Sequence, residues 1–106
     1  MKAKNIDINE IITRIGHYRN EAQLSARGLS LTIDKNGAYI NHLENKKVNL
    51  KVSVLLDILD VFEISCAEFF SDNYETYKED KEILDLLKAL PLERKKLILE
   101  LIKNIK

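Results

Sequence analysis

Prolines and glycines are almost absent from this chain, and their scarcity is the feature that most limits how it can fold. One proline and three glycines are spread over 106 residues, so the segments between them run long without a residue that breaks helices. These segments are rich in Leu, Ile, Glu and Lys, and their apolar residues recur at helical spacing. We therefore expect an all-α protein whose core is aliphatic, because the chain has no tryptophan.

The pair Asn36-Gly37 is the strongest signal against an all-helical chain, because Asn-Gly is typical of a tight β-hairpin turn. A strand after it would need apolar residues at alternate positions, whereas Tyr39 and Leu43 follow helical spacing. The segment before the pair alternates too briefly for a first strand. We therefore predict that Asn36 caps a helix over 36–45 and that Gly37 opens it.

Capping residues and apolar periodicity mark the other elements. Asp7, Ser25, Asn49 and Ser65 are the predicted N-caps, and Ser65-x-x-Glu68 has the form of a capping box. We expect five helices in residues 1–72, including one over 25–33 and an apolar, central one after Asn49. A polar connection over 73–80 and a helical pair over 81–106, divided at Pro91, complete the predicted organisation.

Charge and cysteine content narrow the class of protein. The formal net charge is zero, but residues 24–51 carry five bases and two acids, and residues 52–71 carry four acids and no base. The single cysteine, Cys66, lies in an apolar run, which predicts a buried thiol and no internal disulfide. With no apolar run of about 20 residues and no apolar segment near the start, we expect no membrane span, no signal peptide and a cytoplasmic location.

Two short helices joined by a tight turn, within a basic segment of a small helical bundle, are typical of a helix-turn-helix. Ser30 is small where the helices approach, and Asp34 occupies a turn position that needs a left-handed backbone. Four apolar residues have the spacing that two steeply crossing helices need: Leu29, Ile33, Ile40 and Leu43.

The run "LSARGLSLTIDKNGAYINHLENKK" resembles the helix-turn-helix of XRE/Cro-type, lambda-repressor-like transcriptional regulators. The matching positions are Arg19, Leu24, Ser25, Leu29, Tyr39, Ile40, Leu43 and Glu44, and "LLDILDVFEISCAEFF" resembles the segment that closes the family's domain. The resemblance covers about residues 8–71. It implies a five-helix DNA-binding bundle, a repressor function, operator binding as a homodimer, and an ion pair between Arg19 and Glu44.

The resemblance also implies which residues would contact double-stranded DNA. Ala26 stands where many members carry a glutamine, and Gly37 and Ala38 stand where they carry longer base-reading side chains. Base reading would then fall to Ala38 at a thymine methyl, Asn41 at an adenine and His42 at a guanine. The predicted contacts to the DNA backbone are Arg27, Lys35, Asn36, Gly37, Tyr39, Lys46, Lys47 and Lys51.

Other functions have weaker support in the sequence. His17, His42 and Cys66 lack metal-ligand spacing, and no nucleophile arrangement or phosphate loop is present, so we expect no catalysis, metal or cofactor. A protein-interaction module such as an antitoxin or anti-repressor is the alternative, favoured by the side chains missing at Gly37 and Ala38. The apolar stripes of the last two helices either complete the protein's own core or bind a second copy.

Overall fold

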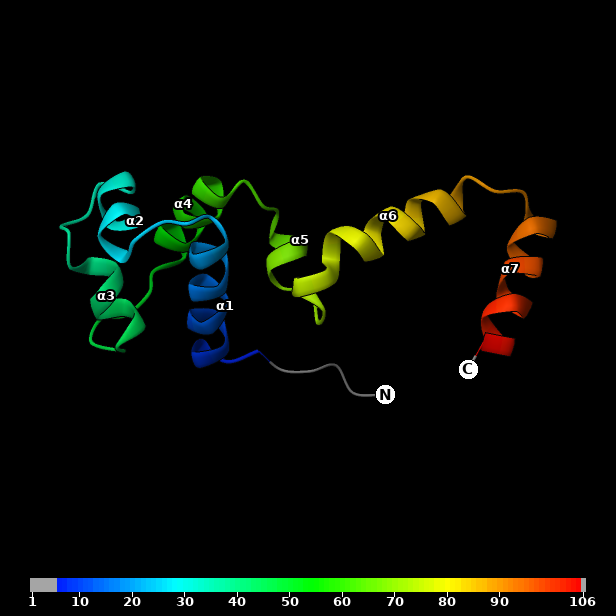
Figure 1. Ribbon diagram of the computed structural model, residues 1–106. Helices are drawn as coiled ribbons and strands as arrows, with labels where there is room; N and C mark the ends of the chain where they lie inside the picture. The colour runs from blue at the N-terminus through cyan, green and yellow to red at the C-terminus, as the bar shows by residue number, and fades with distance from the viewer. Residues whose placement is uncertain (1–5, 106) are drawn as a thin grey trace. The chain divides into compact units, whose positions relative to one another are not determined.

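The computed structural model describes residues 6–105, and within them it contains seven α-helices, one 3₁₀ turn and no strand (Figure 1). The prediction of an all-α protein is confirmed. The expectation about a signal peptide rests partly on residues 1–5, which lie outside the described residues. The chain divides into unit 1, Met1–Asp72, and unit 2, Asn73–Lys106. The helices are α1 (Ile8–Glu21), α2 (Ala26–Thr32), α3 (Tyr39–Glu44), α4 (Val52–Phe62), α5 (Cys66–Phe69), α6 (Tyr77–Lys88) and α7 (Leu92–Ile105), with the 3₁₀ turn η1 at Tyr74–Thr76.

Unit 1 has an aliphatic core to which all five of its helices contribute. The buried apolar residues are Ile12, Ile15, Tyr18, Leu29, Ile33, Ile40, Leu43, Val54, Leu55, Ile58, Leu59 and Phe69. Tyr18 of α1 brings the aromatic residues together, because its ring stacks on Phe62 and lies 6.0 Å from the ring of Phe69. Its hydroxyl donates a 2.9 Å hydrogen bond to the buried carboxylate of Glu68, which ties α1 to α5.

A fully buried arginine holds the end of α5 against α1. Arg14 has no exposed surface, and its Nη1 donates to the carbonyls of Phe69 at 2.7 Å and Ser71 at 2.8 Å. Its Nη2 lies 3.3 Å from Glu10 Oε1, one turn earlier in α1. Carbonyls at a helix end have no partner within the helix, so Arg14 satisfies backbone groups that burial would otherwise leave unpaired.

Side-chain caps fix the starts of three helices, as predicted. Asp7 accepts from the Glu10 amide at 2.9 Å, and Ser25 accepts from the Gly28 amide at 2.8 Å. Ser65 accepts from the amide of Glu68 at 3.1 Å. Each cap satisfies one of the amides that a helix start leaves without an internal partner.

Helices α1 to α4 are each followed by a left-handed residue that is not glycine. Gln23, Asp34, Lys46 and Glu63 have φ values between +56° and +62°, which few residues other than glycine adopt readily. After each one, the next amide bonds back to a carbonyl five residues earlier, as in Lys47 to His42 at 2.8 Å. Asp34 is the residue for which the sequence predicted this conformation.

Two predicted helix starts are wrong. Helix α3 begins at Tyr39, with Ala38 as its N-cap, and not at Gly37. The Asn36 side chain does accept from the Ala38 amide at 3.0 Å, but that bond closes a turn before the helix. Helix α4 begins after Lys51, which has no side-chain cap, so Asn49 is not its N-cap.

Burial also corrects two predictions. The Cys66 thiol is exposed and not buried, because the short α5 turns Phe69 inward and leaves its first residue outside. Helix α4 is not buried on all sides. It buries one face, whereas its residues Val52 and Leu56 are 74% and 47% exposed.

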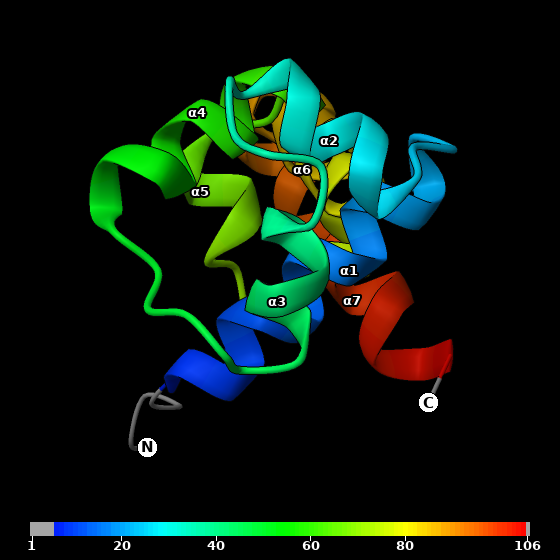
Figure 2. The ribbon, with the colours of Figure 1, turned by 90° about the vertical axis from the view of Figure 1, so that its left-hand side faces the viewer.

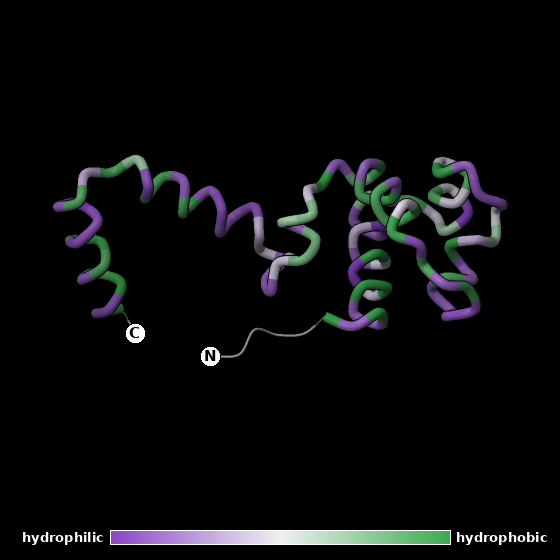
Figure 3. Tube along the Cα trace, turned by 180° about the vertical axis from the view of Figure 1, so that it is seen from behind, coloured by the Kyte–Doolittle hydropathy of each residue, from purple (hydrophilic) through white to green (hydrophobic). Residues whose placement is uncertain are grey.

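Unit 2 consists of η1, α6 and α7. Helix α6 begins at Tyr77, so the predicted connection over 73–80 is half helical, as its Lys and Glu content allows. Neither α6 nor α7 has a buried residue. Hydrophobic and hydrophilic segments alternate along both helices (Figure 3), so each has an apolar stripe that the unit itself does not cover.

Candidate nucleic-acid interface

The corner between α2 and α3 is held by one buried serine. Ser30 has no exposed surface; its hydroxyl donates to the Ala26 carbonyl at 2.7 Å and accepts from the Ile40 amide at 3.0 Å. The second bond crosses from α2 to the first turn of α3, which lies against α2 in Figure 2. Leu29 and Ile40 are fully buried, so the corner is fixed by packing and by a polar bond.

An arginine of α1 holds the far end of α3. Arg19 Nε and Nη2 lie 2.9 Å and 3.0 Å from the two carboxylate oxygens of Glu44. Its Nη1 also donates to the Leu24 carbonyl at 2.9 Å, just before α2. The two-pronged geometry is one that a planar guanidinium favours, and it positions α3 relative to α1 and to the start of α2.

The outer face of α3 is exposed and carries mainly amide and imidazole side chains. It is formed by Ala38, Asn41, His42 and Asn45, which follow helical spacing, while Ile40 and Leu43 face the core. Asn45 Nδ2 donates both to the Asn41 carbonyl at 2.9 Å and to Asn41 Oδ1. The amide of Asn41 is therefore oriented by its neighbour, with one lone pair of Oδ1 already engaged.

Gly37 makes room for an arginine. A β-carbon built on Gly37 would overlap Arg27 Nη1 and would lie 3.0 Å from Cζ and 3.3 Å from Cγ of Arg27. The Arg27 side chain thus reaches from α2 across the turn before α3, where no side chain at position 37 competes with it. Arg27 is exposed, and it makes no ion pair within residues 6–105.

Lysines surround the same part of unit 1. Lys35 lies over the ring of Tyr39, with Nζ 5.4 Å from the ring centroid. Lys46, Lys47 and Lys51 follow α3 and are exposed. Lys46 has a left-handed backbone and forms the turn that ends α3. The three lysines therefore belong to this turn and to the segment between α3 and α4.

The structure places the predicted contact residues on α2, on α3 and on the segments before and after α3. Ala38, Asn41 and His42 share the outer face of α3, and the predicted cations come from the segments on either side of it. Two features of this candidate site were not predicted from the sequence. Asn45 lies four residues after Asn41, a spacing that could have indicated the amide pair, whereas the bond from Ser30 to Ile40 has no signal in the sequence.

Other kinds of site have little support. No group of three or more His, Cys, Asp or Glu side chains in the described part of the chain could hold a metal ion. A shallow pocket between α2 and α4 is lined by Asp34, Asp57 and Asp60, together with Thr32, Ile33 and Val61. No helix within residues 6–105 is long and apolar enough to cross a membrane.

Comparisons with known proteins do not assign the chain to a family. No family model, no curated protein and no solved structure matches it.

Proposed function

We propose that unit 1 is an XRE/Cro-like helix-turn-helix domain and that the protein is a sequence-specific DNA-binding transcriptional regulator, a repressor that binds operator DNA. In this proposal, α2 and α3 form the helix-turn-helix, and the outer face of α3 enters the major groove. A major groove admits a single α-helix, and the amide and imidazole groups of this face can hydrogen-bond to its base edges.

One observation carries the proposal: α3 presents an exposed polar face on a corner that is rigidly held and bordered by cations. Ser30 and the Arg19–Glu44 pair fix the helix, while its outer residues have no partner in the core. Arg27, Lys35, Lys46, Lys47 and Lys51 supply positive charge for phosphates. Oriented polar groups beside exposed cations suit specific binding to a duplex, in which phosphate contacts position the protein and base contacts give the specificity.

Salt-titrated binding to random duplex DNA, followed by selection from a random pool, tests the proposal. We expect log affinity to fall steeply with log salt concentration and a sequence motif to be enriched. Lys46→Ala/Lys47→Ala should weaken binding to all sequences alike and reduce the salt slope by about 2. Lys96→Ala/Lys103→Ala in α7 removes the same charge and should leave both unchanged. If binding has no salt dependence and no motif is enriched, the proposal fails.

The Asn41–Asn45 amide pair refines how bases would be read. With Asn45 bound to Oδ1, the Nδ2 group of Asn41 is the stronger candidate for a base contact, as a donor to a purine N7. Asn41→Ala should relax preference at one base pair. Asn45→Ala should free Oδ1 of Asn41. The preference at that base pair should then shift toward adenine, which needs both a donor and an acceptor. Uniform losses from both variants would exclude Asn41 from base reading.

The approach of Arg27 to Gly37 gives a second test within the same proposal. Gly37→Ala would displace the Arg27 side chain, because the new β-carbon occupies its place. If Arg27 contacts DNA from that position, Gly37→Ala should weaken binding in the wild-type background and have little effect in an Arg27→Ala background. Additive effects of the two substitutions would show that Arg27 does not act through this position.

A protein-interaction module is the second candidate. At the N-terminal end of the exposed face of α3, the chain carries only Gly37 and Ala38, which have no side-chain hydrogen-bonding group. The exposed acids Asp57, Asp60 and Glu63 of α4 and its C-cap would then bind a basic protein surface. Loss of partner binding in Asp57→Asn/Asp60→Asn, together with absence of DNA binding in the wild-type protein, would favour this function.

A further inference from the structure

Unit 2 exposes more apolar side chain than its own two helices can cover. Leu86 is 66% exposed, Leu97 is 63% exposed and Ile105 is 81% exposed, and neither helix has a buried residue. Scattered apolar residues are ordinary on a protein surface, but here they lie on one stripe of each helix. A continuous stripe of this kind marks a surface that another element covers.

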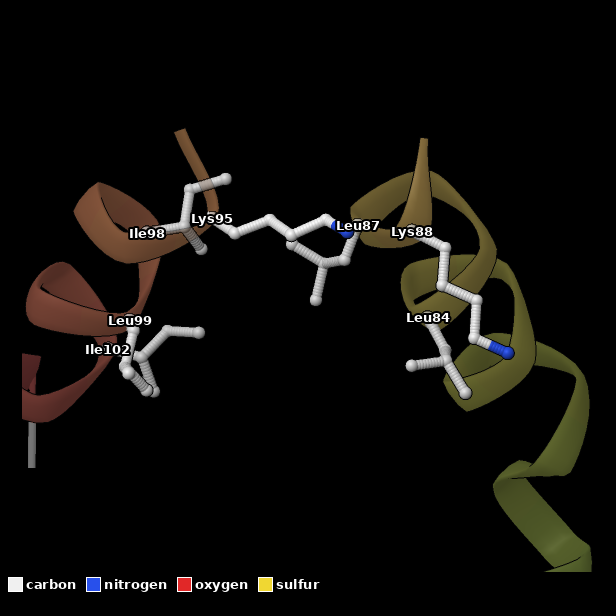
Figure 4. Close-up of a pocket in the computed structure, with 7 residues that line it drawn as sticks. All are labelled: Leu84, Leu87, Lys88, Lys95, Ile98, Leu99 and Ile102. Atoms are coloured by element: carbon white, nitrogen blue, oxygen red, sulfur yellow. The ribbon is translucent and has the colours of Figure 1, made fainter. Parts of the chain in front are cut away.

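The two stripes meet in an apolar groove of about 320 Å³ within unit 2 (Figure 4). Its lining comes from both helices: Leu84, Leu87 and Lys88 of α6, and Lys95, Ile98, Leu99 and Ile102 of α7. The side chain of Lys95 extends from α7 toward α6 in the figure. Leu84, Leu99 and Ile102 remain 49%, 51% and 46% exposed, so the two helices of one chain do not close the groove.

The two helices are near-copies of one pattern. "ILDLLKAL" at 83–90 in and after α6 corresponds to "ILELIKNI" at 98–105 in α7, fifteen positions later. Five apolar residues, the single acid and the lysine fall at the same places in both segments, and only the pair Ala89 and Asn104 differs in kind. Two surfaces with the same shape and spacing can interdigitate in register.

The residues before the shared pattern have opposite charges. Glu79 and Asp80 of α6 correspond to Arg94 and Lys95 of α7. Each lies one turn before the apolar pattern and therefore on the same side of its helix as the stripe. A parallel pairing of α6 with α7 would bring the acids beside the bases, and both charged pairs lie at the N-terminal ends of the helices.

We propose that the apolar stripe of α6 binds α7 of a second copy of this chain, with the two helices parallel and in register. The contact is made twice in a symmetric dimer, once by each α6. Glu79 and Asp80 of one protomer then face Arg94 and Lys95 of the other, and the groove residues of both become buried. The pairing does not depend on DNA, and its failure would leave the proposed function of unit 1 untouched.

Sedimentation equilibrium of the full chain without DNA, from low to high micromolar concentration, tests this pairing. The wild-type protein should be a dimer. Glu79→Lys/Asp80→Lys places bases against bases, and Arg94→Glu/Lys95→Glu places acids against acids. Each variant alone should dimerise at least about tenfold more weakly, because facing like charges oppose association. An equimolar mixture should form a heterodimer of nearly wild-type affinity, since every α6–α7 contact then joins opposite charges.

Asp85→Lys/Glu100→Lys is the matched control. It changes the net charge as much as Glu79→Lys/Asp80→Lys does, but both residues lie on the faces opposite the stripes, so dimerisation should be unchanged. Three results would each overturn the proposal: a monomeric wild-type protein, reversed variants that associate like wild type, or a mixture that forms no heterodimer. The mixture also separates this pairing from contact of α6 with α7 inside one chain, which mixing cannot restore.

Discussion

Unit 1 and unit 2 are built from similar amphipathic helices, yet only unit 1 has a core. Within the described residues, all of the buried apolar side chains belong to unit 1, whereas the stripes of α6 and α7 are exposed. Helix α6 has the more pronounced apolar stripe of the two long helices in unit 2, and it still buries nothing. Amphipathicity therefore predicts that a helix has a partner, but it does not say whether that partner belongs to the same chain.

The polar contacts differ in the same way. In unit 1, side chains bridge distant parts of the sequence, as when Arg14 bonds the carbonyl of Phe69 and Tyr18 bonds Glu68. In unit 2, Lys81 donates to Asp85 and Thr76 to Asp80, each four residues away. Long-range bonds specify a tertiary arrangement, whereas local pairs support the helix alone. Substitutions in unit 1 should therefore affect stability far more than substitutions in unit 2.

The largest loss is expected for Arg14→Met. It removes the donor for the carbonyls of Phe69 and Ser71 and the 3.3 Å contact with Glu10. A buried acceptor left without its donor costs about 1–3 kcal/mol, and Arg14 serves two carbonyls. Hydrogen exchange should show faster opening of α1 and α5, with exchange in α6 and α7 unchanged.

Arg14→Lys is the informative companion to this variant. A lysine keeps the charge but cannot donate to both carbonyls and Glu10 in the same planar arrangement. It should recover only part of the stability. If Arg14→Met lowers the free energy of unfolding by less than about 1 kcal/mol, the arginine is not holding α5.

A smaller loss is expected for Ser30→Ala. The Ile40 amide would lose its acceptor inside the corner, and an unsatisfied buried amide costs about 1–3 kcal/mol. Thr32→Ala is the matched control, because Thr32 also bonds a carbonyl four residues back but is exposed. Equal changes in the denaturation midpoints of the two variants would mean that the cross-helix bond adds nothing.

Three helix starts were predictable from the sequence because capping is local. Asp7, Ser25 and Ser65 each carry a side chain that reaches its own first turn, so residue type and spacing are sufficient. Ends were harder to place, since the left-handed residues at Gln23 and Glu63 give no glycine signal. The start of α3 was misplaced for a related reason: Asn36 forms a turn with the same kind of bond that a cap would make.

The candidate site was predictable in outline but not in its contacts. Helical spacing places Asn41 and His42 on one exposed face, but the reach of Arg27 across Gly37 depends on a side-chain conformation that no pattern encodes. Arg14 did leave a signal, because it interrupts the apolar stripe of α1 between Ile11 and Tyr18. The fifteen-residue correspondence between α6 and α7 is short, and it becomes informative only once both stripes are seen to be exposed.

A gain in stability is expected for Glu63→Gly. Glu63 ends α4 with φ +56°, a conformation that costs a residue with a β-carbon about 1 kcal/mol relative to glycine. The substitution should raise the free energy of unfolding of unit 1 by somewhat less than that, because glycine also loses more entropy on folding. Glu63→Ala removes the same carboxylate without relieving the backbone, so thermal denaturation should show no gain for it.

The smallest effect is expected in unit 2, at the pair formed by Lys81 and Asp85. The Lys81 ammonium, 2.8 Å away, lowers the pKa of Asp85, and the carboxylate in turn raises the pKa of Lys81. Because the pKa of Asp85 is lower in the helix than in the unfolded chain, its support for α6 is complete above the unfolded value. That support is lost as the pH falls through the pKa that Asp85 has in the folded protein, which lies below about 4. Asp85→Asn should therefore reduce the helicity of α6 slightly at neutral pH and match wild type in acid, as measured by NMR chemical shifts along the helix. Glu82→Gln is the control, because it alters a neighbouring carboxylate that has no ion pair within residues 6–105. An equal loss of helicity in Glu82→Gln would show that the Lys81–Asp85 pair does not stabilise α6.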